Sequence, residues 1–449
     1  MTAAIVLGAI GLVWVAVEVA LRVAVGRGLA TDFYGSLSRE DVRAEQERHG
    51  VRVASGCGWA HLGWIADPER ERYRIERRSA AGGWETVAHA RYGSLLVRAA
   101  GRYRVWAVAR GAGGSRLVGE ADAQPGSKDP PLRVPRIAGP WRVLFRPSVH
   151  GFYVNDHAIF RDAAGRFRLL GITDRSRGNY DAERRFAHGV ADAFPPEDGM
   201  READPVADFG DLAWAPFVVE KDRRYHLFWS PHRLEHMTSD DGVRWEDRRT
   251  AIRAPMHRFF RDASVVEVAP GQFLLHATGR GRWFSRVDAY QSFDLERWQY
   301  IGPALRFRPG SERNSAFAST ETPSVTCVDG RWYLAFTCNN GSRFWSPLFL
   351  LLRRWPDPPS YNDTLVLHAD NPYGFGDYRG RRRTPALVTT LETHAPRLYR
   401  HPETGAWWIT TAGWPWAATL TSGEVAVAPL AWDDDPATGS PRPPGRRKV

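Results

Sequence analysis

The chain has 449 residues, of which 43% are hydrophobic and 25% are charged, and it carries a formal net charge of +10. This length is sufficient for more than one domain and a large core. The charge excess comes almost entirely from arginines spread along the chain, without a basic stripe or a nucleic-acid motif, so nucleic acid is excluded as the expected partner. The three cysteines have no C-x-x-C spacing, which excludes a zinc motif and a disulfide framework.

The N-terminal stretch, residues 3–26, is apolar except for Glu18 and Arg22, which lie four positions apart and can pair on one helix face. We therefore expect residues 1–30 to form a hydrophobic anchor or a signal-like helix. The bulk of the chain would then be membrane-anchored or secreted, and extracytoplasmic. Arg22 and Arg27 argue the other way, for a cytoplasmic C-terminal side. The alternative is a start codon assigned upstream of a soluble protein.

The next two regions are predicted to be a short helix and a small β-domain. Residues 31–50 are expected to form a helical connector, with Ser38 as the N-cap and Gly50 as the stop. Residues 51–123 contain short alternating strands between glycine and proline turns, which predicts a β-sandwich. Its Tyr-Arg-Ile-Glu-Arg and Arg-Tyr-Arg-Val-Trp-Ala strands resemble those of fibronectin type III modules. A linker at 124–136 follows.

An internal repeat organises the rest of the chain. Four segments each contain a strand, a turn and a second strand, which opens with an aromatic residue eleven positions after the first residue. The pairs of first residue and aromatic are Asp156 and Phe167, Trp214 and Tyr225, Asp262 and Phe273, and Glu321 and Trp332. A fifth copy runs from His394 to Trp408 with a longer turn. In the fourth copy, Asp329-Gly330 separates two strand-like runs, which is a strong hairpin signal.

The spacing of the copies predicts the fold. Successive copies begin 58, 48, 59 and 73 residues apart, close to the period of a propeller blade. We therefore predict an all-β fold with a five-bladed β-propeller at 137–432, preceded by the sandwich and the N-terminal helix and followed by a disordered basic tail at 433–449. Equivalent positions of the blades are expected to form a ring around a central funnel. The ring would consist of Asp156, Trp214, Asp262, Glu321 and His394.

Three acids in one funnel suit the cleavage of a glycosidic bond. That reaction needs one protonated carboxyl group to donate to the leaving oxygen and one ionised carboxylate to activate water or attack the sugar. A third carboxylate close to the acid raises the pKa of the acid, because like charges disfavour a second ionisation. Asp156, Asp262 and Glu321 can supply this set without a metal, so no cofactor is required.

The motifs at these positions resemble those of the five-bladed propeller glycosidases in glycoside hydrolase families 43 and 32. Val-Asn-Asp, ending at Asp156, resembles their Asn-Asp motif, and Thr-Glu-Thr-Pro around Glu321 resembles Glu-Cys-Pro or Glu-Gly-Pro. Arg-Asp before Ala263 resembles Arg-Asp-Pro, with alanine in place of the proline. Trp-Ala-Pro from Trp214 resembles the start of blade two in family 43, but Phe217 stands where an acidic residue is usual.

The resemblance, which covers about two thirds of the chain, implies a role for each residue. Asp156 would be the general base of an inverting enzyme or the nucleophile of a retaining one. Asp262 would tune the pKa of the acid and hold the sugar, and Glu321 would be the general acid. It also implies a central cation, usually calcium, near a histidine of blade five. Substrate contacts are expected from Asn155, Trp214, Arg261 and His394.

Two functions remain open at this point. The first is a glycosidase that acts on a furanoside or pentose-containing glycan such as arabinan, xylan or fructan. The second is a non-catalytic carbohydrate-binding propeller, in which the departures at Phe217 and Ala263 mark a drifted site. Each acid also has a purely structural interpretation, since Asp156 can cap a turn and Asp262 can pair with Arg261 at the surface. The sequence indicates no oligomeric state.

Overall fold

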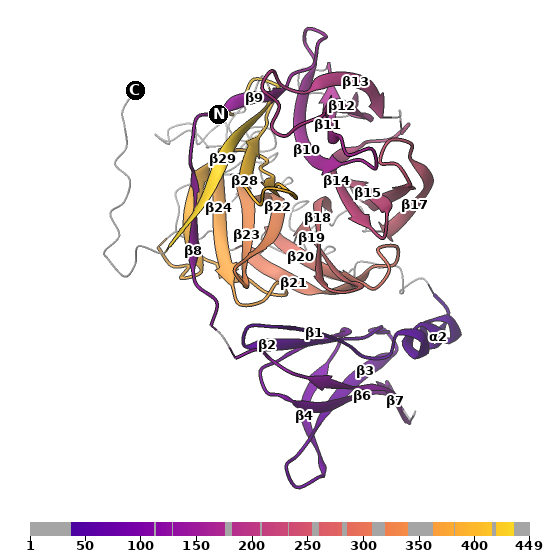
Figure 1. Ribbon diagram of the computed structural model, residues 1–449. Coiled ribbons are helices and arrows are strands. Elements are labelled where there is room, and N and C mark those ends of the chain that lie inside the picture. The colour runs from indigo at the N-terminus through magenta and orange to yellow at the C-terminus, as the bar shows by residue number, and fades with distance from the viewer. Residues whose placement is uncertain are drawn as a thin grey trace, which may run out of the picture.

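The computed structural model describes residues 37–111, 114–127, 129–175, 182–206, 209–231, 233–253, 260–280, 285–307, 319–339, 362–380, 382–414 and 419–434. These residues form an all-β molecule with a small N-terminal module and a larger ring of sheets (Figure 1). The helix predicted at 1–30 and the tail beyond residue 434 lie outside the described residues. In the part of the chain that is described, no helix combines the length and the apolar character needed to cross a membrane.

The N-terminal module begins with helix α2 (Arg39–His49), which confirms the predicted connector helix. The side-chain oxygen of Ser38 accepts a hydrogen bond from the Asp41 amide, and Gly50 ends the helix with φ of 58°. A three-stranded and a four-stranded sheet then enclose one apolar core, which confirms the predicted sandwich. The first sheet contains β1 (Arg52–Gly56), β2 (Trp59–Gly63) and β5 (Ser94–Val97), and the second contains β3 (Glu71–Arg78), β4 (Trp84–Ala90), β6 (Gly101–Ala109) and β7 (Ser115–Ala123). The likeness to fibronectin type III modules stays a prediction.

Five sheets form the propeller, and we number them as blades in chain order (Figure 1). Blade 1 contains β10 (Tyr153–Arg161), β11 (Phe167–Asp174), β12 (Arg185–Ala191) and β13 (Arg201–Val206). Blade 2 contains β14 (Trp214–Lys221), β15 (Arg224–Ser230), β16 (Arg233–Ser239) and β17 (Glu246–Arg253). Blade 3 contains β18 (Arg261–Ala269), β19 (Gln272–Arg280), β20 (Ser285–Ser292), β21 (Gln299–Phe307) and β25 (Gly376–Tyr378). Blade 4 contains β22 (Ser319–Val328), β23 (Arg331–Asn339), β24 (Asp363–Ala369) and β26 (Leu387–Glu392).

Blade 5 is built from both ends of the propeller sequence. Its strands are β27 (Leu398–Arg400), β28 (Trp407–Thr411) and β29 (Val425–Asp434), and β29 also pairs with β8 (Arg133–Ile137) and β9 (Arg142–Phe145). Leu430 lies opposite Ile137, and Trp432 lies opposite Pro135. The C-terminal part of the predicted linker is therefore a strand that helps to close the ring.

The predicted hairpin of blade 4 is confirmed. Val328 pairs with Arg331 across Asp329 and Gly330, whose φ values of 50° and 88° are those of a two-residue turn with two left-handed residues. The aromatic residues that open the second strands lie in apolar layers between neighbouring blades. For example, Tyr225 of blade 2 packs in one cluster with Phe160 and Phe186 of blade 1. These layers hold the blades in a fixed order around the axis.

The N-terminal module docks on the outer ends of blades 3 and 4, away from the funnel. The side-chain amide of Gln291 donates to the carbonyl oxygens of Trp64 and Gly93, at 3.0 and 2.8 Å, and Gln272 donates to the Val53 carbonyl at 2.7 Å. Gln272 pairs with Ala269, the last residue of β18, and the nine residues of β18 span roughly 25–30 Å. The module therefore contributes no residue to the start of the inner strands, where the predicted acids lie.

Candidate active site

A β-bulge interrupts the innermost strand of blades 1 to 4 near its start. The residues before the bulge are Val154, Trp214, Arg261 and Glu321. The next two residues, the bulge residues, lie opposite a single residue of the partner strand before pairing resumes. Asp262 is the first bulge residue of blade 3, whereas Asp156 is the second bulge residue of blade 1. A bulge redirects side chains and is common at active sites.

The prediction that the acids occupy equivalent positions is therefore wrong. The β10–β11 turn spans residues 162–166, whereas the corresponding turns of the next three blades contain two residues each. An additional irregularity between Glu267 and Ala269 lengthens β18. These differences in turn and bulge length produce the common spacing of eleven residues. The three acids nevertheless lie at one end of the inner strands, because all of them belong to the bulge region.

Left-handed backbone conformations hold the bulges in shape. The first bulge residues of blades 2, 3 and 4, Ala215, Asp262 and Thr322, have φ values of 47°, 58° and 47°. Such values are strained for residues other than glycine, and strain of this kind gathers at functional sites. In blade 1 the bulge packs against Gly171, where a Cβ atom would lie only 2.4 Å from Cγ1 of Val154.

One guanidinium group joins two of the acids. Nη1 of Arg261 lies 3.0 Å from Oδ2 of Asp262, and Nη2 lies 2.7 Å from Oε1 of Glu321. The residues are largely buried, with exposed fractions of 2% for Asp262 and 5% for Glu321. This arrangement overturns the interpretation of Arg261 and Asp262 as a surface pair. Because the pair is withdrawn from water, its interaction is far stronger than that of an exposed salt bridge.

Asp156 joins the same network through Thr322. The Thr322 hydroxyl donates to Oδ1 of Asp156, and the Thr322 amide donates to Oδ2 of Asp262 at 3.1 Å. The side-chain amide of Asn155 donates to Oδ2 of Asp156 at 2.9 Å. The structure thus brings together Asn155, Asp156, Arg261, Asp262 and Glu321, as the sequence predicts, and adds Thr322 as the residue that links them.

Burial dominates the protonation of the two aspartates. It raises the pKa of Asp262 to about 7, and the charges of Asp156 and Glu321 act in the same direction while Arg261 opposes them. Burial also raises the pKa of Asp156, against the hydrogen bond from Thr322 and the charge of Arg397. At neutral pH the cluster therefore retains a proton, as a general acid–base site requires.

Arg397 is a site residue that the sequence analysis did not identify. Its Nε donates to the His157 carbonyl at 2.6 Å, and its guanidinium carbon lies 5.2 Å from the centre of the Phe217 ring. Only 5% of the residue is exposed, and Nη1 has no hydrogen-bond partner among the described residues. A signal was present in the repeat, because Arg397 follows His394 by the same three positions by which Phe217 follows Trp214. The departure at Phe217 thus provides a ring for a buried cation.

His394 and Trp214 lie at the starts of blades 5 and 2. His394 is 1% exposed, its amide donates to the Thr411 hydroxyl at 3.1 Å, and its ring centre lies 5.6 Å from that of Trp414. Trp214 is half-buried as the first residue of β14. Their roles as substrate contacts stay predictions.

The described residues contain no group of three or more His, Cys, Asp and Glu side chains that could hold a metal ion. The cation that the resemblance implies near His394 therefore stays a prediction. Arg397 already supplies a buried positive charge to this region, where it acts on Asp156 and Asp262.

A fourth carboxyl group, Glu183, lies near Asp156, and the sequence analysis did not identify it either. It is 1% exposed and accepts a hydrogen bond from the Tyr153 hydroxyl. It comes from the segment before β12, outside the hairpins on which the repeat is based, so the repeat gave no signal for it.

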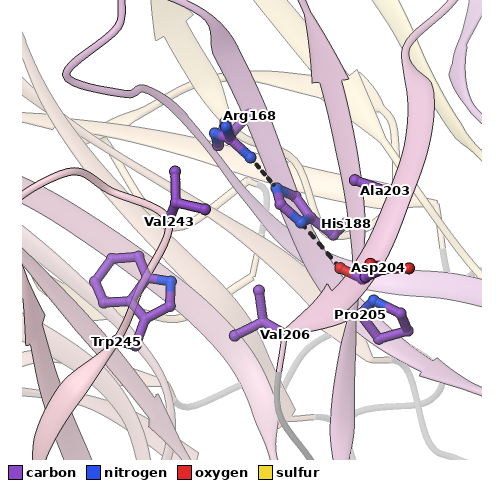
Figure 2. Close-up of a pocket in the computed structure, with 8 residues that line it drawn as sticks. All are labelled: Arg168, His188, Ala203, Asp204, Pro205, Val206, Val243 and Trp245. Carbon is purple, nitrogen blue, oxygen red and sulfur yellow. Dashed lines mark hydrogen bonds between the residues drawn. The ribbon is translucent and has the colours of Figure 1, made fainter.

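A separate cavity of about 370 Å³ lies between blades 1 and 2, and Figure 2 shows the residues that line it. Arg168 Nη1 donates to His188 Nε2 at 2.7 Å, so Nδ1 of the neutral imidazole donates to the Asp204 carbonyl at 3.1 Å. Burial lowers the pKa of His188, which favours this neutral form. The cavity contains none of the bulge residues, and these polar groups are paired with one another.

No protein-family model matches the chain, and no curated protein sequence matches it. Several solved structures are similar in fold. A thermostable family-43 glycoside hydrolase is 14% identical with a TM-score of 0.44, over 66% of this chain and 97% of its own. The GH43_1 enzyme from Xanthomonas citri complexed with xylotriose is 14% identical with a TM-score of 0.41, over 64% and 91%. An exo-1,5-α-L-arabinanase from a bovine ruminal metagenomic library is 12% identical with a TM-score of 0.42, over 62% and 93%.

Proposed function

We propose that the chain is a glycoside hydrolase that cleaves a furanoside- or pentose-containing glycan at the start of the inner strands. One observation supports this most strongly. Three carboxyl groups from blades 1, 3 and 4 belong to one hydrogen-bonded network, joined by Arg261 and Thr322. Glycoside hydrolysis needs carboxyl groups in different protonation states on either side of one bond, and this network can hold them so.

In this proposal Glu321 is the general acid that donates a proton to the leaving oxygen. Arg261 holds Glu321 beside Asp262, whose pKa is raised mainly by burial and further by the charges of Asp156 and Glu321. Asp262 therefore helps to retain the proton that Glu321 delivers.

Asp156 is the ionised partner that activates water or attacks the sugar. Burial raises the pKa of Asp156, and the Thr322 hydroxyl and the charge of Arg397 oppose this by favouring its ionised form. Asn155 orients the carboxylate through its side-chain amide. The substrate contacts assigned to Trp214 and His394 belong to the same proposal.

A carbohydrate-binding propeller without activity is the second candidate, and one observation favours it. The hydrogen bond from Arg261 stabilises the ionised form of Glu321, which would weaken Glu321 as a proton donor. A catalytic site therefore requires the bound sugar to draw Arg261 or Glu321 out of this pair.

The two candidates are distinguished by turnover. Wild type would be incubated with aryl furanosides and pyranosides and with arabinan, xylan and fructan, beside Asp156→Asn and Glu321→Gln. Glu220→Gln serves as a matched control, because Glu220 is an exposed carboxylate of β14. We expect turnover of at least one pentose or furanoside substrate, lost in both site variants and kept in the control, with melting temperatures showing that all of them fold. Sugar binding that survives both substitutions, without turnover by wild type, would support the binding propeller instead.

A further inference from the structure

Glu183 lies where blades 1, 2 and 5 approach one another. Its carboxylate accepts the hydrogen bond from Tyr153, which precedes Asp156 by three positions on β10. Its backbone carbonyl accepts a hydrogen bond from the amide of Ala213 at 2.8 Å, just before β14. Trp414, after β28, also acts on the Glu183 side chain, whose pKa it lowers.

The charges around Glu183 are those of other acids. Asp156 on β10 and Asp174 at the end of β11 both act on it. Among the described residues, no arginine, lysine or histidine forms an ion pair with Glu183. Its chain neighbour Arg185 lies with its guanidinium carbon 5.4 Å from the centre of the Phe152 ring.

Among the described residues, the funnel end therefore contains more acids than cations. The buried carboxyl groups of this described set are Asp156, Glu183, Asp262 and Glu321. Its guanidinium groups are those of Arg397, which is buried, and Arg261, whose side chain is 14% exposed. A site that is withdrawn from water resists a net charge, so this set is expected to keep two protons. The acid chemistry of the proposed reaction uses only one of them.

We propose that Glu183 is a positioning residue that carries the second proton and thereby controls how strongly Asp156 acts as a base. This inference rests on the proposed function, in which Asp156 is the ionised partner. Glu183 would not touch the sugar, because its side chain is enclosed by Tyr153 and its neighbours.

The control acts through charge. Burial raises the pKa of Glu183 to about 7, and the charges of Asp156 and Asp174 act in the same direction, against the hydrogen bond from Tyr153 and the influence of Trp414. Below that pH Glu183 is neutral. Above it, a second negative charge appears beside Asp156 in a medium of low dielectric, which makes proton uptake by Asp156 more favourable.

The side chain can be neutralised while its hydrogen bond with Tyr153 is kept. In Glu183→Gln the amide oxygen still accepts the Tyr153 hydroxyl, and the backbone bond to Ala213 is unaffected. Glu220→Gln is again the control for the loss of one exposed carboxylate.

The test is the ratio of kcat/KM between wild type and Glu183→Gln as a function of pH. We expect the two to agree within about twofold at pH 5, where Glu183 is protonated, and wild type to be about three- to tenfold faster at pH 8. The ratio for Glu220→Gln stays flat. A flat ratio for Glu183→Gln, or a loss of 100-fold or more at every pH, would overturn the positioning role.

A second measurement does not depend on turnover. Infrared titration in an Asp262→Asn background is expected to show a carboxyl group that ionises near pH 7 and is missing from Glu183→Gln. The carboxyl of Asp156, identified by its absence in Asp156→Asn, should ionise at lower pH once Glu183 is neutralised. If wild type hydrolyses none of the substrates, the proposed function fails, but this titration still decides the coupling: an unchanged ionisation of Asp156 would overturn it.

Tyr153→Phe supports the same test if Glu183→Gln does not fold. Loss of the hydroxyl removes a hydrogen bond that favours ionised Glu183, so the pH dependence assigned to Glu183 should move to higher pH. An unchanged profile in Tyr153→Phe would contradict the proposal.

Discussion

The two ends of blade 3 are both buried, but their polar groups are paired in different ways. At the start of β18, Arg261 and Asp262 belong to a cluster in which carboxyl groups outnumber guanidinium groups. At the other end, Gln272 and Gln291 fasten the N-terminal module with neutral amide donors aimed at backbone carbonyls. The protonation of the funnel end can therefore change, whereas the docking end satisfies its polar groups with uncharged hydrogen bonds.

Within this one sheet, the groups that respond to pH and ligands therefore lie apart from the groups that hold the two domains together. Buried charges are costly, and their protonation responds to pH and to ligands. Neutral hydrogen bonds to backbone carbonyls respond to neither, so they suit a permanent contact between domains. Variants at the funnel end should therefore change activity and pH dependence, whereas variants at the docking end should change stability alone.

The largest effect is expected from Asp156→Asn. Removal of the proposed base should lower kcat/KM by about 100- to 10,000-fold. The free energy of unfolding should change by less than about 2 kcal/mol, because Asn retains an oxygen for the Thr322 hydroxyl and loses a charge that burial disfavours. Kinetics and urea denaturation of the same preparation test both parts. A large loss of stability that accounts for the loss of activity would break the separation between the two ends.

Asp262→Asn should change how stability depends on pH. A carboxyl group whose pKa is raised in the folded state contributes stability below its unfolded pKa, and this contribution is lost as pH rises through the folded value of about 7. Wild type should therefore lose a few kcal/mol between about pH 4 and 7 that Asp262→Asn keeps. Denaturation at several pH values measures this, with Asp222→Asn, in the exposed β14–β15 turn, as the control. Parallel curves for wild type and Asp262→Asn would contradict it.

At the docking end, the free energy of unfolding should depend on pH in the opposite direction. Burial lowers the pKa of His61 to about 3, and the neutral ring stacks on Tyr373 with 3.7 Å between centroids. The contribution of neutral His61 to the free energy of unfolding is complete above pH 6.5 and is lost as pH falls toward 3. The loss is about 2 kcal/mol at pH 5. His61→Gln should lose less stability than wild type between pH 7 and pH 5. An equal loss would show that His61 does not report on the docking end.

The smallest effect is expected from Gln291→Ala. The Trp64 carbonyl keeps a 3.2 Å hydrogen bond from Gln299, but it and the Gly93 carbonyl lose their bonds to Gln291, which should cost about 1–2 kcal/mol of unfolding free energy. Activity should stay within about twofold of wild type, since the acids lie at the other end of the blade. A clear change in kcat would show that the two ends are coupled through blade 3.

The sequence predicted the hairpins because their signals are local. Asp329-Gly330 needs only two residues that tolerate positive φ, and the aromatic residue at the start of each second strand marks an interblade layer. These features repeat, so they were sufficient to predict five blades and the three acids.

The same reasoning could not predict which positions of the inner strands are equivalent from blade to blade. Counting residues cannot distinguish one that belongs to a turn from one inserted in a bulge, so Asp156, Asp262 and Glu321 seemed equivalent when they are not. Arg397 and Glu183 depend on contacts between blades distant in sequence, such as that of Arg397 with the His157 carbonyl. No local pattern encodes such a contact.

The closure of blade 5 makes the funnel a property of the completed chain. Ile137 pairs with Leu430, so the ring cannot be closed during synthesis until nearly three hundred further residues have left the ribosome. Before then, Arg397 has no fixed place opposite Asp156. Pairings between such distant residues form slowly, since a long loop must be closed first. A nascent chain can thus contain every acid of the site and still lack a complete funnel until its last strand has been synthesised.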